Sequence, residues 1–213
     1  MKTKNLLLST VAAGSLFLIS CGGSPENTND ATADTAVPEP EVIETVEHTV
    51  DLSNSSVSWA GEMMGMYKHN GTVNISEASL STAGDKVVGG NFTVDLSTIT
   101  PLDDNYKADE EGHTKEDLVG HLSSPDFFDV ANFGTATFEV TGSSEDGNSI
   151  SGNLTIRGIS NEETVEDVTN SDGAVSGTLT FDRTKYDVSF SHPMKEMVLS
   201  NDIVLNISLK VAE

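Results

Sequence analysis

Five apolar side chains recur at every second position near the end of the chain: Ile203, Leu205, Ile207, Leu209 and Val211. A period of two places all five on one face of an extended strand, opposite a face that is mostly polar. Residues 92–96, 150–156 and 175–181 repeat this pattern. Because strands that are apolar on a single face must bury that face against other strands, the chain is constrained to an all-β fold with a shared interior.

Other short runs complete a set of candidate strands. The set comprises residues 49–51, 57–60, 71–76, 86–96, 135–141, 150–156, 164–168, 175–181 and 203–211. Gly84-Asp85, Asp146-Gly147 and Asp172-Gly173 suit tight hairpin turns, which join antiparallel neighbours. These strands can form a sandwich or close into a barrel, and closure removes the exposed edges. We therefore predict an eight-stranded antiparallel β-barrel, whose interior is about wide enough for one small ligand.

A long acidic insertion at residues 97–133 interrupts the run of strands. An insertion of this length within a compact domain is expected to contain helix and to serve a function, for example as a lid. Thr114 is followed three residues later by Asp117 rather than by the preferred glutamate or glutamine. The pair is therefore only a marginal signal for a capped helix start.

The end of the insertion carries two adjacent aromatic residues, Phe127 and Phe128. The preceding Ser124-Pro125-Asp126 predicts a helix start, because serine suits the cap, proline the first turn and aspartate the positive end of the helix dipole. The resulting helical turn is expected to carry both phenylalanines inward, directly before a half-buried strand at residues 135–140.

The chain is strongly acidic, with a formal net charge of −23 over 213 residues. This charge repels the phosphates of nucleic acids, which argues strongly against a nucleic-acid partner, and it equally disfavours adhesion to an anionic membrane surface. A charged, well-solvated surface is the simplest interpretation.

The amino terminus has the features of an export signal. Lys2 and Lys4 precede an apolar run at residues 6–19 that is too short to span a bilayer comfortably. We predict a signal peptide at residues 1–20, an acidic disordered tether at residues 21–47 and the barrel domain at residues 48–213. Because Cys21 is the single cysteine of the chain, no disulfide can form within it.

Several stretches, in order along the chain, resemble the YceI-like lipid-binding domain family. They are residues 121–130, Thr135-Ala136-Thr137-Phe138, residues 152–159 and Asp182-Arg183, with fainter matches at residues 57–59, 69–72 and 90–99. The resemblance implies a lipocalin-like antiparallel barrel crossed by a helix, with a polyisoprenoid or other amphiphilic lipid in its apolar interior.

Leu18-Ile19-Ser20-Cys21-Gly22 is similar to the bacterial lipobox, which implies a lipid on the sulfur of Cys21. Ordinary secretion with an incidental cysteine is the alternative. More than one acyl chain would make such an anchor stable. Together the two resemblances imply a lipid-anchored protein of the bacterial cell envelope, periplasmic or associated with the outer membrane.

A lipid carrier needs an apolar tunnel with a few polar groups at its mouth. The predicted ligand-binding residues are Trp59, Phe92, His121, Phe127, Phe128, Phe138, Leu154, Ile156, Phe181 and Leu205. Glycines at positions 89, 90, 152 and 177 interleave the large residues and are expected to leave space. The alternative is that the side chains fill the barrel, which would then be a structural or protein-interaction module.

Polar candidates are few. His121 can bond a ligand head group or tie the insertion to a neighbouring carbonyl. Arg157 and Arg183 can meet a head group or pair with carboxylates, and Lys68 and His69 share this ambiguity.

The chain lacks the motifs of common hydrolases and nucleotide-binding enzymes, and its histidines are not at metal-ligand spacing. We therefore expect a binding protein rather than an enzyme, without a metal or cofactor; an enzyme acting on lipid is the remaining alternative.

Overall fold

The computed structural model describes residues 43–63, 67–107, 109–110, 112–188 and 199–212, which belong to one compact unit, Glu41–Glu213. The predicted signal peptide, Cys21 and most of the predicted tether lie outside the described residues. Among the described residues, no helix has the length and apolar character needed to cross a membrane.

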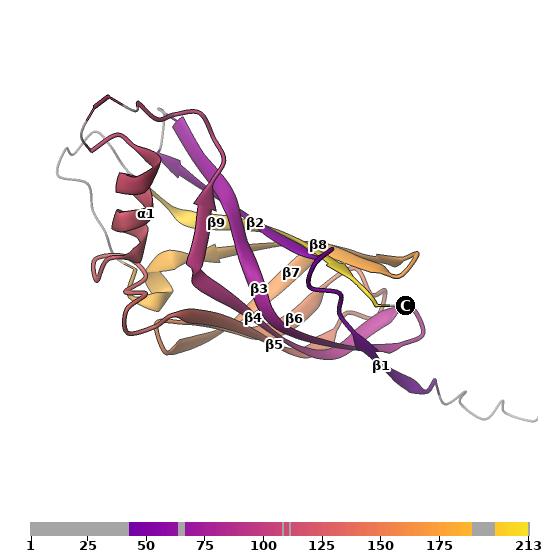
Figure 1. Ribbon diagram of the computed structural model, residues 1–213. Helices are drawn as coiled ribbons and strands as arrows, with labels where there is room; N and C mark the ends of the chain where they lie inside the picture. Colours follow the sequence, from indigo (N-terminus) through magenta and orange to yellow (C-terminus); the bar gives the residue numbers. More distant parts are fainter. Residues whose placement is uncertain (1–42, 64–66, 108, 111, 189–198, 213) are drawn as a thin grey trace, which may run out of the picture. The chain divides into compact units, whose positions relative to one another are not determined.

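Nine strands and one α-helix follow one another along the described residues of this unit (Figure 1). The elements are β1 (Thr45–Thr49), β2 (Ser56–Met63), β3 (Tyr67–Ala83), β4 (Lys86–Pro101), α1 (Lys115–Ser123), β5 (Thr135–Ser143), β6 (Ile150–Ile156), β7 (Ile159–Ser171), β8 (Ala174–Asp182), the 3₁₀ turn η1 (Arg183–Tyr186) and β9 (Leu199–Lys210).

Eight of the strands form a closed antiparallel barrel in the order β2-β9-β8-β7-β6-β5-β4-β3, and β3 closes it by pairing with β2. The additional strand, β1, pairs only with the second half of β3. The predicted eight-stranded antiparallel barrel is therefore confirmed. Its β1 begins at Thr45, so residues 45–47, which the sequence analysis placed in the tether, belong to the sheet.

Each predicted hairpin joins two neighbouring strands. Gly84, Gly147 and the pair Asp172-Gly173 adopt positive φ in the turns that lead into β4, β6 and β8. The sequence analysis missed a further hairpin between β6 and β7, in which Arg157 and Gly158 have φ of 51° and 74°. Positive φ at both central residues is the conformation that matches the twist of paired strands, and it fixes the direction in which Arg157 leaves the barrel wall.

β3 is the longest strand of the barrel and changes the face it buries along its length. Tyr67, His69, Val73 and Ile75 line the interior at every second position. The register with β4 then shifts between Ile75 and Glu77, and Leu80 becomes an inward-facing residue. A bulge of this kind inserts one residue into one strand, which reverses the parity of every side chain beyond it.

The helix of the insertion begins earlier than the serine-proline signal indicated. In α1 the Thr114 hydroxyl accepts from Asp117 N–H at 3.0 Å, and the Asp117 carboxylate accepts from Thr114 N–H at 3.0 Å. Ser124 instead follows the end of this helix, and its hydroxyl donates to the carbonyl of His121 at 2.7 Å. The prediction of a helix start at Ser124 was therefore wrong, because that hydroxyl closes the preceding helix rather than capping a new one.

Five aspartates accept hydrogen bonds within turns and caps. A bond from a neighbouring side chain, supported by backbone N–H groups, lowers the pKa of Asp51, Asp95, Asp117, Asp146 and Asp182. A carboxyl whose pKa is lower in the folded state stabilises the fold above its unfolded pKa, near 4, and loses that contribution as the pH falls through the folded value.

We therefore expect the free energy of unfolding to fall steadily below about pH 4, measured by urea denaturation between pH 7 and pH 2. Between pH 7 and about pH 4 it should rise instead, because protonation of other carboxylates relieves the repulsion within a chain of net charge −23. Asp146→Asn should weaken the decline at low pH. A stability that keeps rising down to pH 2 would contradict the assignment.

Candidate functional site

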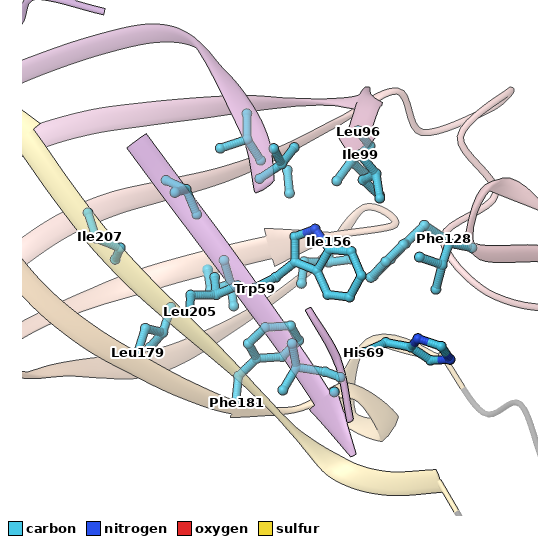
Figure 2. A pocket seen from close by; sticks show the side chains of 18 of the residues that line it. Trp59, His69, Leu96, Ile99, Phe128, Ile156, Leu179, Phe181, Leu205 and Ile207 are labelled. Atoms are coloured by element: carbon cyan, nitrogen blue, oxygen red, sulfur yellow. The ribbon is translucent and has the colours of Figure 1, made fainter. Parts of the chain in front are cut away.

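The barrel encloses a cavity of about 920 Å³ whose wall is largely apolar (Figure 2). All of the residues predicted to contact a ligand line this cavity: Trp59, Phe92, His121, Phe127, Phe128, Phe138, Leu154, Ile156, Phe181 and Leu205. A volume of this size lies near the upper end of the range of roughly 300–1,000 Å³ typical of ligand pockets in proteins. The cavity is the candidate functional site.

The interior of the barrel is hollow rather than filled by its own side chains. Leu179 and Phe181 are almost completely buried in the wall, with 1% and 3% of their surfaces exposed. In contrast, Trp59, Phe138 and Leu205 are only half-buried although they face inward, because the cavity itself exposes them. Tightly packed protein cores leave few voids larger than a water molecule. A cavity of this size is therefore a feature of the fold and not a packing defect.

Glycines let the large aromatic rings lie flat against the wall. A Cβ at Gly71 would lie 2.6 Å from the Trp59 ring, and one at Gly152 would lie 2.4 Å from the Phe138 ring. The expectation that glycines leave space directly is thus wrong for Gly152 and Gly177: the Phe138 ring occupies the space at the first, and a Cβ at the second would lie 2.6 Å from a methyl group of Val165. Because these rings pack along the wall, the centre of the barrel stays open.

The turn after α1 carries the two phenylalanines inward, as predicted. Phe127 is 3% exposed and packs edge-on against both His121 and Phe128, with ring centroids 5.6 Å and 4.8 Å apart. Phe128 is half-buried and lines the cavity at the end where His69 also lies (Figure 2). Phe127 therefore fixes the turn, and Phe128 presents the surface that an occupant would touch.

Arg157 holds this turn against the barrel. Its guanidinium donates to the carbonyl of Phe127 at 2.5 Å and to that of Pro125 at 3.1 Å, and it lies 3.7 Å from the Asp187 carboxylate. The Arg183 guanidinium likewise donates to backbone carbonyls, those of Val188, Leu199 and Ser200. Neither arginine lines the cavity, so both have a structural role in this fold.

We expect Arg157→Asn to lower the free energy of unfolding by about 2 kcal/mol, because two charge-assisted hydrogen bonds to the turn are lost. Asparagine tolerates the positive φ of this position, so the backbone itself is not strained. Urea denaturation measures the loss. Asp187→Asn removes only the exposed ion pair and should change stability by less than about 0.5 kcal/mol; an equal loss in both variants would show that the ion pair, not the carbonyl contacts, secures the turn.

The polar side chains of the lining come from the start of β3, from α1 and from the segment that precedes α1, elements that meet at one end of the barrel (Figure 1). They are Tyr67, His69, Asn105, Tyr106, Lys107, His113, Thr114, Asp117 and His121. Almost all of the remaining lining is apolar, with Thr137 and Ser176 as exceptions. The cavity thus has an apolar body and a polar mouth, which is the distribution that an amphiphilic ligand requires.

At this mouth His69, Asp103 and Tyr106 form a hydrogen-bonded cluster that the sequence analysis missed. The Tyr106 hydroxyl donates to Asp103 Oδ2 at 2.7 Å and lies 3.0 Å from His69 Nδ1, which is itself 3.2 Å from Asp103 Oδ1. Burial raises the pKa of Asp103, but hydrogen bonds from Tyr106 and from the N–H groups of Asn70 and Asn105 outweigh it and lower the pKa overall. The carboxylate is therefore ionised.

Within the described ranges no three His, Cys, Asp or Glu side chains are grouped so that they could hold a metal ion.

A model of the YceI-like domain matches residues 48–211 of the chain. UPF0312 protein SAB2563 of Staphylococcus aureus is 33% identical over 124 residues, which cover 53% of this chain and 67% of that protein. The structure of BcnA from Burkholderia cenocepacia superposes with a TM-score of 0.60 at 20% identity and covers 78% of this chain and 100% of BcnA. A polyisoprenoid-binding domain from Saccharophagus degradans, implicated in plant cell wall breakdown, gives a TM-score of 0.49 at 10% identity, covering 79% of this chain and all (100%) of that domain. By the extent of the family match, this chain belongs to the YceI-like domain family.

Proposed function

We propose that this protein holds one isoprenoid or similar long-chain amphiphilic lipid inside its barrel, for transport, storage or sequestration in the cell envelope. The observation that carries the proposal is the cavity of about 920 Å³ with an apolar body and a polar mouth. An apolar tail placed in this cavity leaves water, which supplies the driving force for binding, and the head group stays at the mouth. Binding of this kind requires no nucleophile and no acid-base pair.

The hollow interior argues against the alternative of a filled barrel that acts only as a structural module. Membership of the YceI-like family supports a lipid as the occupant, because the family resemblance implies an isoprenoid or related ligand. The half-buried Trp59, Phe92 and Phe128 offer wide, rigid apolar surfaces to such a chain.

Trp59 allows a direct test, because it is the only tryptophan of the chain and lines the cavity. Titration of a chain starting at Gly22 with a C20 prenyl alcohol should change the emission of Trp59 and saturate at one ligand per protein. Palmitate and a soluble nucleotide serve as comparison ligands of other classes. Unchanged emission with every apolar ligand, together with no uptake of an apolar dye, would contradict the proposal.

The proposal includes a lipid anchor on Cys21, supported by the similarity of residues 18–22 to a lipobox. The chain enters the barrel domain through β1, at the end of the barrel away from α1 (Figure 1). An anchor before β1 is thus attached to the domain away from the mouth.

Cys21→Ala is expected to release the protein from membranes while the domain stays folded, because the cysteine is the proposed site of lipid attachment. Fractionation of cells by sedimentation, followed by detection of the protein in the membrane and soluble fractions, measures the release. Ser20→Thr, which keeps the cysteine, is the matched control and should remain in the membrane fraction. A Cys21→Ala variant that still sediments with membranes would refute the anchor.

A further inference from the structure

The chemistry of the mouth determines which head group the cavity can accept. His69 lines the cavity, and its side chain keeps 23% of its surface exposed. Its ring is held between two tyrosine rings: Tyr106 stacks on it with centroids 5.3 Å apart, and Tyr67 meets it edge-on at 4.9 Å. The orientation of the imidazole is therefore fixed before any ligand arrives.

The hydrogen bonds around His69 assign its proton to Nδ1. The Tyr106 hydroxyl places its hydrogen on Asp103 Oδ2, at 2.7 Å, and the ionised Asp103 carboxylate has no hydrogen to give. Nδ1 lies 3.0 Å from the Tyr106 oxygen and 3.2 Å from Asp103 Oδ1, so it must be the donor in these contacts. In a neutral imidazole with the proton on Nδ1, the other nitrogen, Nε2, is a hydrogen-bond acceptor.

Most donors near His69 are already engaged. The amide of Asn105 donates to the carbonyl of Lys68 at 2.7 Å, and the Thr114 hydroxyl donates to Asp117 at 2.7 Å. Lys107 pairs with Glu110 at 3.0 Å. Nε2 of His69 has no partner among the residues that the structure describes.

Anionic head groups are disfavoured at this site. The carboxylate of Asp103 lies directly behind His69, and that of Asp117 lies on the cavity wall. The nearby cations are already committed, since Lys107 is paired with Glu110, and Lys115 lies over the Tyr106 ring at 5.4 Å. A phosphate would therefore meet two carboxylates, while these two described lysines already have partners.

We propose that His69, positioned by Asp103 and Tyr106, is a head-group site that accepts a hydrogen bond from a hydroxyl, so that the cavity selects long-chain prenyl alcohols over the corresponding ethers and phosphates. This inference rests on the proposed function and specifies the ligand class of the same cavity. The hydroxyl of Tyr67 lines the same mouth and can both donate and accept, so it assists an alcohol without distinguishing it from an ether.

A matched set of ligands tests the site. The chain from residue 21 to its end, carrying Cys21→Ser so that no anchor competes, is titrated at pH 8 with a C20 prenyl alcohol, its methyl ether and its monophosphate. The ether keeps the oxygen and the tail but lacks the donor hydrogen. We expect the alcohol to bind about tenfold more tightly than the ether, because the ether leaves the Nε2 acceptor unpaired, and the monophosphate to bind more weakly than the alcohol.

Two variants separate the role of His69 from its packing. His69→Phe keeps an aromatic ring between the two tyrosines but removes the acceptor, so the alcohol-to-ether ratio should fall to about one. Asp103→Asn should also lower this ratio, because the amide no longer holds the proton of the imidazole on Nδ1. His48→Phe changes a histidine of β1 that does not line the cavity and should leave the ratio unchanged.

Each outcome has a distinct meaning. If no prenyl ligand, no palmitate and no apolar dye binds, the proposed function fails, and this inference fails with it; if only palmitate or the dye binds, this inference alone fails. If alcohol and ether bind equally tightly to the chain with an intact His69, or if the phosphate binds most tightly, the inference is wrong while the lipid-binding function stands. If His69→Phe or Asp103→Asn keeps the full preference for the alcohol, the selection resides elsewhere and the site assigned here is refuted.

Discussion

Gly71→Ala is expected to lower the free energy of unfolding by about 3 kcal/mol, among the largest effects of any single methyl group in this barrel. A Cβ at this position would lie 2.1 Å from the carbonyl oxygen of Thr100 and 2.6 Å from the Trp59 ring. The Thr100 oxygen belongs to the backbone of β4, which pairs with β3 beside Gly71, so it cannot rotate away. The ring of Trp59 would also be displaced from the wall toward the cavity.

Gly142→Ala is the matched control, because Gly142 also lies in a strand but a methyl group added there would have no atom within 4 Å. The free energy of unfolding of Gly142→Ala should differ from that of the unaltered protein by less than about 1 kcal/mol. Urea denaturation followed by circular dichroism measures both variants, and the emission of Trp59 reports whether its ring has moved. A Gly71→Ala protein as stable as Gly142→Ala would show that the ring does not lie against the strand as described.

Leu205→Trp is expected to reduce the affinity for a prenyl ligand at least about tenfold while the barrel stays folded. Leu205 faces the cavity from β9 and is only half-buried, so the larger side chain has room to enter the space that the ligand needs. The free energy of unfolding should change by less than about 1.5 kcal/mol, because the added atoms fill a void instead of crowding a packed core.

Asn206→Trp provides the control for this variant. Asn206 is the next residue along β9 and is exposed on the opposite face of the strand. The Asn206→Trp protein should therefore bind the ligand as tightly as the unaltered protein does. Displacement of an apolar dye by the C20 prenyl alcohol measures both affinities. If Leu205→Trp and Asn206→Trp bind equally well, the ligand occupies a surface other than the barrel interior.

The strands with simple alternation were predictable from the sequence alone. Residues 203–211 and 150–156 correspond closely to β9 (Leu199–Lys210) and β6 (Ile150–Ile156), because an unbroken period of two needs only local information. β3 was predicted only at residues 71–76 although it runs from Tyr67 to Ala83. Its bulge reverses the buried face, and its first residues are polar because they form the mouth, so no single period describes it.

The apolar part of the site could be predicted, whereas only single candidates, His121 and His69, could be named for the polar mouth. Large apolar residues on the inner faces of strands line the cavity once the barrel closes, which explains why every predicted lining residue was found there. The cluster of His69, Asp103 and Tyr106 joins β3 to a segment more than thirty residues later. The sequence analysis named His69 only as an ambiguous candidate, because one sequence without the fold does not show that it meets Asp103 and Tyr106; the short spacing between those two residues was the only local signal of the cluster.

The most direct test of the account is the mass of the intact protein purified from the cells that produce it, without added lipid or apolar dye. Native mass spectrometry should show one extra apolar molecule per chain, which passes into organic solvent on extraction and is absent from Leu205→Trp. A protein that carries no extractable molecule, and whose mass is that of the chain with the proposed anchor alone, would contradict the claim that the barrel holds a lipid.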